Sequence, residues 1–464
     1  MSFVIYDLTF LAIFTIAIVW FLIAKRKNLE REGIVFLYKT KIGLKVIDYL
    51  GTKHKKVLKI LSYVIVVSGY VLMATMIYLL INLIFIFSQR DLVQIIKVPP
   101  LMPLIPYLPS LFKIEWLPPL YFTYWIIILA VVAIVHEGAH GIYSRYNKIK
   151  VKSTGFGFLG PLLAFFVEPD EKQMKKSKIF PQLTILGAGV FANIIASIFF
   201  FLIMWLFFSM AYTPAGALFN TYSFSMVPVA GLSNITIENE QLQIDGINAT
   251  QVMINGKSYF MWDGHIELLE EYEEGYMKVY QDLPAVREKM KGAIIQINDK
   301  KIMSHDDIRE EIRKHKIGDE ISVTTKDDDE ILNYDIVLGE SYDEEGVPVI
   351  GVGVLISESS GIRGIMLKMM NAFRDPSLKY EPKGGSDFIE FIYFLLWWIV
   401  LINIGVALFN ILPIGITDGG RFWYLSVLGI TKSEKIAGIS YKIVTWIILA
   451  IFALLMVYWG IGII

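Results

Sequence analysis

The pentapeptide His136-Glu137-Gly138-Ala139-His140 carries the residue types of a zinc hydrolase. Histidines four positions apart lie on one face of a helix, where both imidazoles can bind a single Zn²⁺. The glutamate between them can act as a general base toward water. A catalytic zinc also needs a third protein ligand and an open position for water, so the pentapeptide alone is an incomplete site.

Asp418 is the candidate third ligand. It lies in the segment Asn410-Ile-Leu-Pro-Ile-Gly-Ile-Thr-Asp-Gly-Gly420, whose proline and paired glycines are expected to break a helix. A broken helix lets a carboxylate project inward while its freed backbone groups line a cavity. Asp-Gly-Gly alone is typical of an ordinary turn, and its pairing with His-Glu-x-x-His favours the ligand interpretation. Since the chain has no cysteine, a metal must rely on His, Asp or Glu.

The residues before the pentapeptide indicate a membrane setting, because Tyr121 to Val135 has no polar face. The 464-residue chain is 55% hydrophobic and 19% charged, with a mean hydropathy of +0.53, values typical of an integral membrane protein. Its net charge of −1 gives no reason to expect nucleic-acid binding. A charge at the centre of a membrane helix costs about 2.5–3.5 kcal/mol and usually marks function. The alternative is a chance motif, or two interfacial histidines satisfied by headgroups and water.

Apolar stretches long enough to cross a bilayer predict a polytopic α-helical membrane protein with six transmembrane helices. The first stretch is followed by Lys25-Arg26-Lys27 and lacks a small-residue cleavage site, so it is expected to be a retained anchor. The stretches are Phe3–Ala24, Ile60–Phe87, Leu120–Tyr143, Leu183–Ala211, Phe388–Leu412 and Ile439–Ile463.

Basic residues gather in three links, 25–59, 145–178 and 421–442, which share one side if the spans alternate. The positive-inside rule makes that side cytoplasmic. Both termini and the large segment after Ala211 are then extracytoplasmic. His136, His140 and Asp418 are expected near the cytoplasmic side of a cell membrane.

The two motifs HEGAH and NILPIGITDGG together resemble the diagnostic motifs of the site-2 protease family of intramembrane zinc metalloproteases. This resemblance implies that His136, His140 and Asp418 bind one Zn²⁺ per chain and that Glu137 activates its water. It also implies that the third, fourth and fifth spans form the catalytic core.

Two asparagines are further candidates for the site. Gly187 to Asn193 resembles the G-x-x-x-N element of the family. Asn193 is therefore expected to face the active site as a substrate-binding or oxyanion residue, or simply to pack between helices. Asn410 belongs to the second diagnostic motif. Its amide could bind the substrate backbone or stabilise the oxyanion, or it could hold the broken helix in shape.

The apolar, glycine-punctuated segment Val151 to Asp170 resembles the family's membrane-reentrant β-hairpin. The edge of such a hairpin could pair with an extended substrate strand. The alternative is a plain interfacial hairpin.

The charged segment 214–386 resembles a PDZ domain, an accessory domain that many family members carry. We expect strands up to Ile302, a helix from Ser304 to Lys314, paired strands at Gly318–Thr325 and Ile331–Leu338, and a late strand at Val349–Leu355. Extra material at Gln241–Gly275 matches the peptide-binding loop poorly. The domain could bind peptide termini, filter substrates by size or cap the site.

The expected function is hydrolysis of peptide bonds within or near transmembrane segments, with a transmembrane protein or a signal peptide as substrate in the lipid bilayer. One alternative is a catalytically inactive zinc-binding scaffold, which the intact Glu137 disfavours. Another is a transporter, which the lack of repeated halves disfavours. The oligomeric state stays open.

The sequence predicts five segments. Residues 1–119 hold two spans and a Pro-rich external loop, and residues 431–464 hold the last span. Residues 120–213 and 387–430 are expected to form the two halves of the catalytic core, and residues 214–386 the PDZ-like domain.

Overall fold

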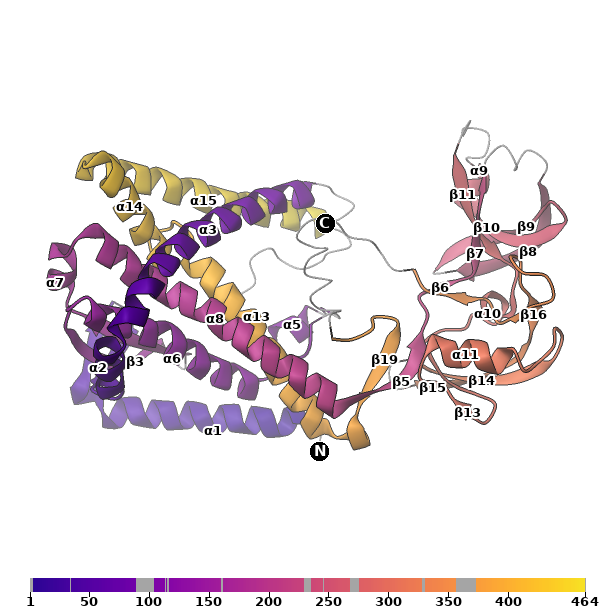
Figure 1. The fold of residues 1–464 in the computed structure, drawn as a ribbon, viewed down its shortest axis with the longest axis horizontal. Coiled ribbons are helices and arrows are strands. Elements are labelled where there is room, and N and C mark those ends of the chain that lie inside the picture. The colour runs from indigo at the N-terminus through magenta and orange to yellow at the C-terminus, as the bar shows by residue number, and fades with distance from the viewer. Residues whose placement is uncertain are drawn as a thin grey trace. The chain divides into compact units, whose positions relative to one another are not determined.

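The computed structural model divides the chain into two compact units (Figure 1). Unit 1 comprises Met1–Leu206 and Phe391–Ile464, and unit 2 comprises Phe207–Glu390. Residues 98–103, 113, 115 and 116 of the Pro-rich loop lie outside the described part of the chain. The structure describes residues 3–33, 35–88, 104–112, 114, 117–159, 162–228, 235–244, 246–267, 275–327, 330–355 and 373–463.

Six helices of the described chain are long and apolar enough to cross a membrane, which confirms the six expected spans. Even the shortest, with 22 residues, is about 33 Å long at 1.5 Å per residue, enough for a hydrocarbon core of about 30 Å. The spans are α1 Phe3–Ala24, α3 Lys55–Ser88, α6 Phe122–Tyr146, α8 Ile179–Ala211, α13 Asp387–Asn410 and α15 Glu434–Ile463. Shorter helices are η1 Arg26–Asn28, α2 Leu44–Lys53, α5 Leu108–Leu111, α7 Glu171–Lys176 and α14 Asp418–Thr431.

Some spans extend past the apolar stretches. α3 begins at Lys55 rather than Ile60, and α15 begins at Glu434 rather than Ile439. The reason is that backbone hydrogen bonding continues through charged residues, whereas an apolar stretch stops at the first of them. The helix ends beyond the apolar stretch are therefore polar turns attached to membrane spans.

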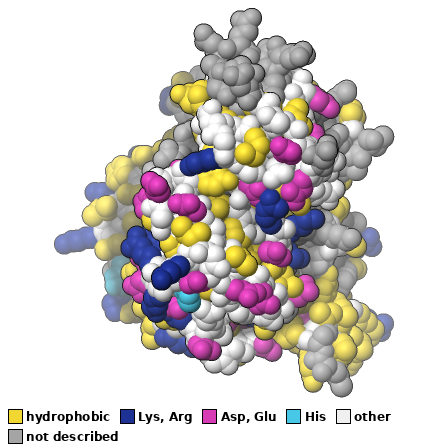
Figure 2. Space-filling model, turned by 90° about the vertical axis from the view of Figure 1, so that its right-hand side faces the viewer, with side chains coloured by type: hydrophobic (Ala, Val, Ile, Leu, Met, Phe, Trp, Pro, Cys, Tyr) yellow, Lys and Arg dark blue, Asp and Glu magenta, His cyan; other side chains and the backbone are white. Residues whose placement is uncertain are grey.

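The outer surfaces of the two units differ in character. The spans expose large apolar side chains, among them Trp20, Ile60 and Trp446. The face in Figure 2, which lies over unit 2, carries Lys, Arg, Asp and Glu side chains interspersed with hydrophobic ones. An apolar exposed surface suits lipid, and a mixed charged surface suits water.

The expected hairpin at 151–170 is part of a larger antiparallel sheet in the order β1-β2-β3-β4. Its strands are β1 Leu29–Glu32, β2 Val35–Thr40, β3 Val151–Leu159 and β4 Leu162–Pro169. β2 pairs with β3, so the basic link after α1 contributes half of the sheet. At Gly155 a Cβ atom would lie 2.4 Å from the Tyr38 carbonyl oxygen, so this pairing requires glycine. Lys39 adds ion pairs to Glu30 at 2.8 Å and to Glu168 at 3.3 Å.

Unit 2 contains two main antiparallel sheets. One has the order β7-β11-β10-β9-β8, and the other has the order β15-β14-β12-β5-β19 with β13 paired to β12. The first sheet comprises β7 Phe224–Pro228, β8 Thr236–Ile244, β9 Ile247–Ile254, β10 Lys257–Trp262 and β11 Tyr276–Gln281. The second comprises β5 Tyr212–Leu218, β12 Ala293–Ile297, β13 Lys300–Lys301, β14 Glu320–Asp327, β15 Glu330–Val337 and β19 Leu378–Pro382. The helices are α9 Asp263–Glu267, α10 Pro284–Arg287, α11 His305–Ile312 and η3 Lys383–Gly385.

Several expected elements of unit 2 are confirmed, namely the strand before Ile302, the helix near Ser304–Lys314 and the paired strands after it. The continuous strand expected at Val349–Leu355 is wrong. Gly351 has a φ of 97°, and this left-handed residue separates two short pieces. Each piece pairs with a different partner: β17 Pro348–Val349 with β16 Gly339–Glu340, and β18 Val352–Gly353 with β6 Thr221–Tyr222. The extra material at Gln241–Gly275 contributes to the five-stranded sheet.

Candidate metal centre

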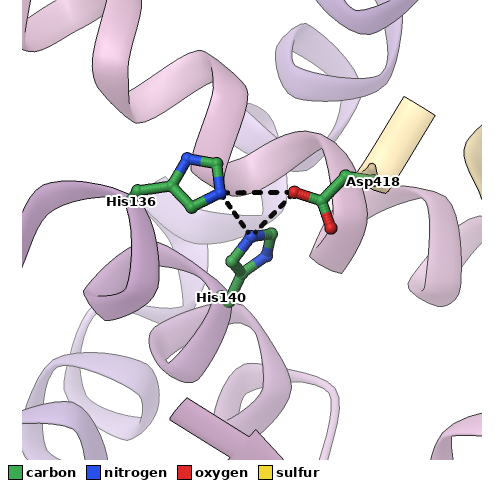
Figure 3. Close-up of side chains that lie close together, drawn as sticks. All are labelled: His136, His140 and Asp418. Atoms are coloured by element: carbon green, nitrogen blue, oxygen red, sulfur yellow. Dashed lines mark hydrogen bonds and ion pairs between the residues drawn. The ribbon is translucent and has the colours of Figure 1, made fainter. Parts of the chain in front are cut away.

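Side chains from two distant segments converge in unit 1 (Figure 3). The Nε2 atoms of His136 and His140 lie 3.1 Å apart, and Asp418 Oδ2 lies 3.3 Å from the first and 3.1 Å from the second. The two histidines are only 7% and 8% exposed. The Asp418 side chain is 22% exposed, so two buried imidazoles meet a partly exposed carboxylate.

The two histidines reach the same point because they lie one turn apart on α6. Their ring planes are nearly perpendicular, at 82°, with both Nε2 atoms directed to one side. Each imidazole can therefore offer a lone pair to the same position in space.

Asp418 reaches this point because the chain breaks between α13 and α14. α13 ends at Asn410 and α14 begins at Asp418. A Cβ atom at Gly419 would lie 2.1 Å from the Ile411 carbonyl oxygen, and one at Gly420 would lie 2.0 Å from the Ile414 carbonyl oxygen. Only glycine fits at these two positions. The Asp418 carboxylate also lies at the positive end of the α14 helix dipole, which stabilises its negative charge.

The neighbours of His140 determine which of its nitrogens carries the proton. Nδ1 lies 2.7 Å from the Ile185 carbonyl oxygen, which can only accept a hydrogen bond. The Nδ1–H group therefore donates to this carbonyl, and Nε2 keeps its lone pair for a metal.

Asn193 on α8 orients the other imidazole. Its amide lies 3.0 Å from His136 Nδ1, and its Oδ1 is buried without a hydrogen-bond partner among the described residues. Turning the amide over directs Oδ1 toward Nδ1–H, which satisfies the oxygen and leaves Nε2 free for a metal. The position of Asn193 fits a role in orienting His136. The substrate-binding or oxyanion role expected from the sequence stays a prediction.

Gly189, one turn before Asn193 on α8, allows the helix to approach both imidazoles. A Cβ atom at this position would lie 2.5 Å from His140 Nε2 and 2.8 Å from His136 Cε1. No heavier residue fits without displacing a histidine. In the sequence, Gly189 can be recognised only as one of several small residues on the fourth span, so its role at the site could not be predicted.

Glu137 contacts the four-stranded sheet. The Val167 amide of β4 donates a hydrogen bond of 3.0 Å to Glu137 Oε2. This bond orients the carboxylate beside the two histidines. The sequence could not predict the role of Val167, because a backbone N–H donor does not show in the residue type.

A cavity of about 550 Å³ opens beside these groups. It is lined by His136, Glu137, His140 and Asp418, and by residues of β4. Asn410 and Arg421 also line it, and Arg421 is a cation that the sequence analysis did not single out.

Asp7 ties α1 to the first turn of α6. It is 1% exposed, and it accepts hydrogen bonds from the backbone amides of Phe122 at 2.7 Å and Thr123 at 2.8 Å. The hydroxyls of Tyr107 and Thr123 also donate to it. This carboxylate therefore caps the helix that carries the histidines.

The donor set and its geometry fit zinc. The candidate ligand atoms of His136, His140 and Asp418 lie within 4.8 Å of one another. Tetrahedral Zn²⁺ with bonds of about 2.0–2.1 Å separates its ligand atoms by about 3.3 Å. The observed separations of 3.1–3.3 Å are close to this value. Three protein ligands leave a fourth position toward the cavity.

Comparison with known proteins adds two findings. The profile of peptidase family M50 matches residues 124–452, a range that contains every residue of the centre. Over 446 residues the chain is 25% identical to an uncharacterized protein of Methanocaldococcus jannaschii, and the match covers 91% of this chain and 90% of that protein.

Proposed function

Because this chain belongs to peptidase family M50, the site-2 protease family, we propose that it is an intramembrane zinc metalloprotease. It hydrolyses peptide bonds within or near transmembrane segments of membrane proteins. The observation that carries this proposal is the buried cluster of two imidazoles and a carboxylate, adjoining a cavity that Glu137 also lines.

In this proposal His136, His140 and Asp418 hold one Zn²⁺ per chain. When bound, the metal would polarise the scissile carbonyl and lower the pKa of water to about 7. The Ile185 carbonyl and the Asn193 amide fix the two imidazoles, so neither ring has to reorient.

Glu137 supplies the proton transfer. Its carboxylate takes a proton from the attacking water and returns it to the leaving amine. The Val167 N–H bond to Oε2 leaves the other carboxylate oxygen for this task. The Asn410 amide, which lines the same cavity, is proposed to bind the substrate carbonyl or the oxyanion.

An extended substrate is proposed to pair with β4. Among the described strands β4 pairs only with β3, so its other edge can accept a further strand. The same strand lines the cavity, which brings a paired substrate backbone close to Glu137. Pairing of this kind would hold a transmembrane segment in the unwound form that cleavage requires.

The orientation in the membrane is also a proposal. The basic links follow the C-terminal ends of α1, α6 and α13, which supports a cytoplasmic location for these three ends. Both termini and unit 2 are then extracytoplasmic. A PDZ-like role for segment 214–386 as a filter or cap is supported by the strands and helix found where that resemblance expects them.

The decisive experiment uses the full chain in detergent with a model single-span substrate. Wild type should cleave it, a chelator should stop cleavage, and added Zn²⁺ should restore it. Glu137→Gln should be inactive while keeping its zinc. Zinc-loaded wild type that cleaves no substrate would favour the scaffold alternative, and cleavage by Glu137→Gln would contradict the proposed mechanism.

A further inference from the structure

A strongly basic pocket lies at the corner between α2 and α3, away from the metal centre. Its volume is about 550 Å³, and five of its lining residues are cationic, Lys55, Lys56, Lys59, Arg145 and Lys148. None of its lining residues is acidic. We refer to it as the basic pocket.

The pocket forms because α2 packs closely against the last turn of α6. A Cβ atom at Gly51 would lie 2.7 Å from Arg145 Cβ and from the Ile142 carbonyl oxygen, so this approach requires glycine. Asp48, one turn earlier on α2, forms an ion pair with Arg145. In the described parts of the chain no carboxylate forms an ion pair with the four lysines. The pocket therefore presents an uncompensated positive charge that would attract an anion.

An apolar groove of about 680 Å³ lies between α3, α6 and α8. Its lining is hydrophobic, and Leu58, Ile142, Phe191 and Phe199 contribute to it from the three helices. We refer to it as the apolar groove.

The pocket and the groove follow one another along the same two helices. On α3, Leu58 of the groove lies between Lys55 and Lys59 of the pocket. On α6, Ile142 of the groove precedes Arg145 of the pocket by three residues, about 4.5 Å along the axis. A single amphiphilic molecule can therefore occupy both.

The expected depth of the two cavities in the membrane indicates which class of molecule binds there. The membrane span α3 begins and the membrane span α6 ends at the basic pocket, which puts it at headgroup level with the groove among the acyl chains. We propose that pocket and groove together bind one anionic phospholipid, with its phosphate among the lysines and an acyl chain in the groove. This binding is independent of whether the chain hydrolyses peptides.

The test is native mass spectrometry of the full chain in an uncharged detergent, titrated with phosphatidylglycerol, phosphatidylcholine or inorganic phosphate. One phosphatidylglycerol should be retained in preference to phosphatidylcholine. In the triple variant Lys55→Gln/Lys56→Gln/Lys59→Gln, binding should weaken about 100-fold, since each lysine near an anionic headgroup contributes roughly five-fold. The control Lys432→Gln/Lys435→Gln/Lys442→Gln removes the same charge beside another span and should bind as wild type does.

The groove has its own matched pair on α8. Ile195 lines it and Ile198 does not, and both side chains are exposed. Ile195→Trp should fill the groove and weaken phosphatidylglycerol binding, whereas Ile198→Trp should leave it unchanged. Circular dichroism and gel filtration establish that each variant is folded.

Three results would overturn the proposal. The first is equal retention of phosphatidylglycerol by wild type and a folded triple lysine variant. The second is equal retention of phosphatidylcholine and phosphatidylglycerol by wild type. The third is displacement of the lipid by inorganic phosphate at equal concentration, which would make the pocket a site for free phosphate.

Discussion

Two clusters of histidine and carboxylate, one in each unit, show how differently such groups can be assembled. In unit 1, His140 and Asp418 are 278 positions apart in sequence, and their Nε2 and Oδ2 atoms lie 3.1 Å apart. In unit 2, His315 lies 3.9 Å from a Glu311 oxygen and 3.9 Å from an Asp319 oxygen, each four positions away. The His315, Asp319 and Glu311 side chains are 26%, 48% and 10% exposed, whereas those of His136, His140 and Asp418 are 9%, 11% and 22% exposed.

The difference between the clusters is one of desolvation. Charged residues four apart on a polar segment meet without long-range folding, and such pairs contribute about 0.3–0.5 kcal/mol. Burying two imidazoles and a carboxylate together costs far more unless a ligand such as a metal compensates. In the candidate metal centre, each imidazole also has a fixed hydrogen-bond partner, Ile185 for His140 and Asn193 for His136. We therefore expect substitutions in the first cluster to abolish function and those in the second to have small effects.

Among substitutions that leave the candidate zinc ligands in place, the largest effect is expected for Glu137→Gln. The amide cannot accept the proton, so cleavage of a single-span substrate should fall about 10²–10⁴-fold. Zinc content should stay at the wild-type level, because Glu137 is not one of the clustered ligands. Initial cleavage rates and metal analysis on the same preparation measure both quantities. A variant with wild-type activity would remove Glu137 from the mechanism.

Gly189→Ala tests the close approach of α8. Its new Cβ would displace an imidazole, at a cost of about 1–3 kcal/mol, so zinc affinity should fall by roughly 5- to 150-fold. Gly138→Ala is the matched control, because nothing lies within 4 Å of a Cβ at that position on α6. Competition with a chelator measures both affinities, and equal values for the two variants would contradict the packing argument.

Asn193→Ala should weaken zinc binding about 10- to 100-fold, the usual effect of removing a residue that orients a metal ligand. Asn403→Ala provides the control. Asn403 is equally buried, but its amide donates to the Ile399 carbonyl of its own helix. Zinc loss in both variants alike would point to general destabilisation rather than to orientation of His136.

The smallest effect is expected in unit 2. The hydrogen bond from Lys314 outweighs desolvation and lowers the pKa of Glu311. A group whose pKa is lowered by folding stabilises the protein at a pH above its unfolded-state pKa, and this contribution is lost as the pH falls through its folded-state pKa. Glu311→Gln should therefore cost below about 1 kcal/mol at pH 7 and less at an acidic pH. Thermal unfolding at the two pH values measures this. A gap that widens in acid would reverse the sign of the argument.

The sequence could predict those parts of the site and the fold that depend on local patterns of residues. The spacing of His136 and His140 follows from helix periodicity, and the spans follow from hydropathy. Pairing of β2 with β3 was not foreseen, because Val35–Thr40 is separated from its partner by two helical spans of chain. The Asp7 cap and the Val167 donor were also missed, since each depends on tertiary contacts that leave no periodic signal.

Zinc content tests the central claim most directly. Metal analysis of the purified full chain should give one zinc per wild-type chain, none in Asp418→Ala and one in Asp319→Ala, its counterpart in the exposed cluster of unit 2. Zinc retained in full by a folded Asp418→Ala, or lost equally from Asp319→Ala, would contradict the assignment of the buried cluster as the metal centre.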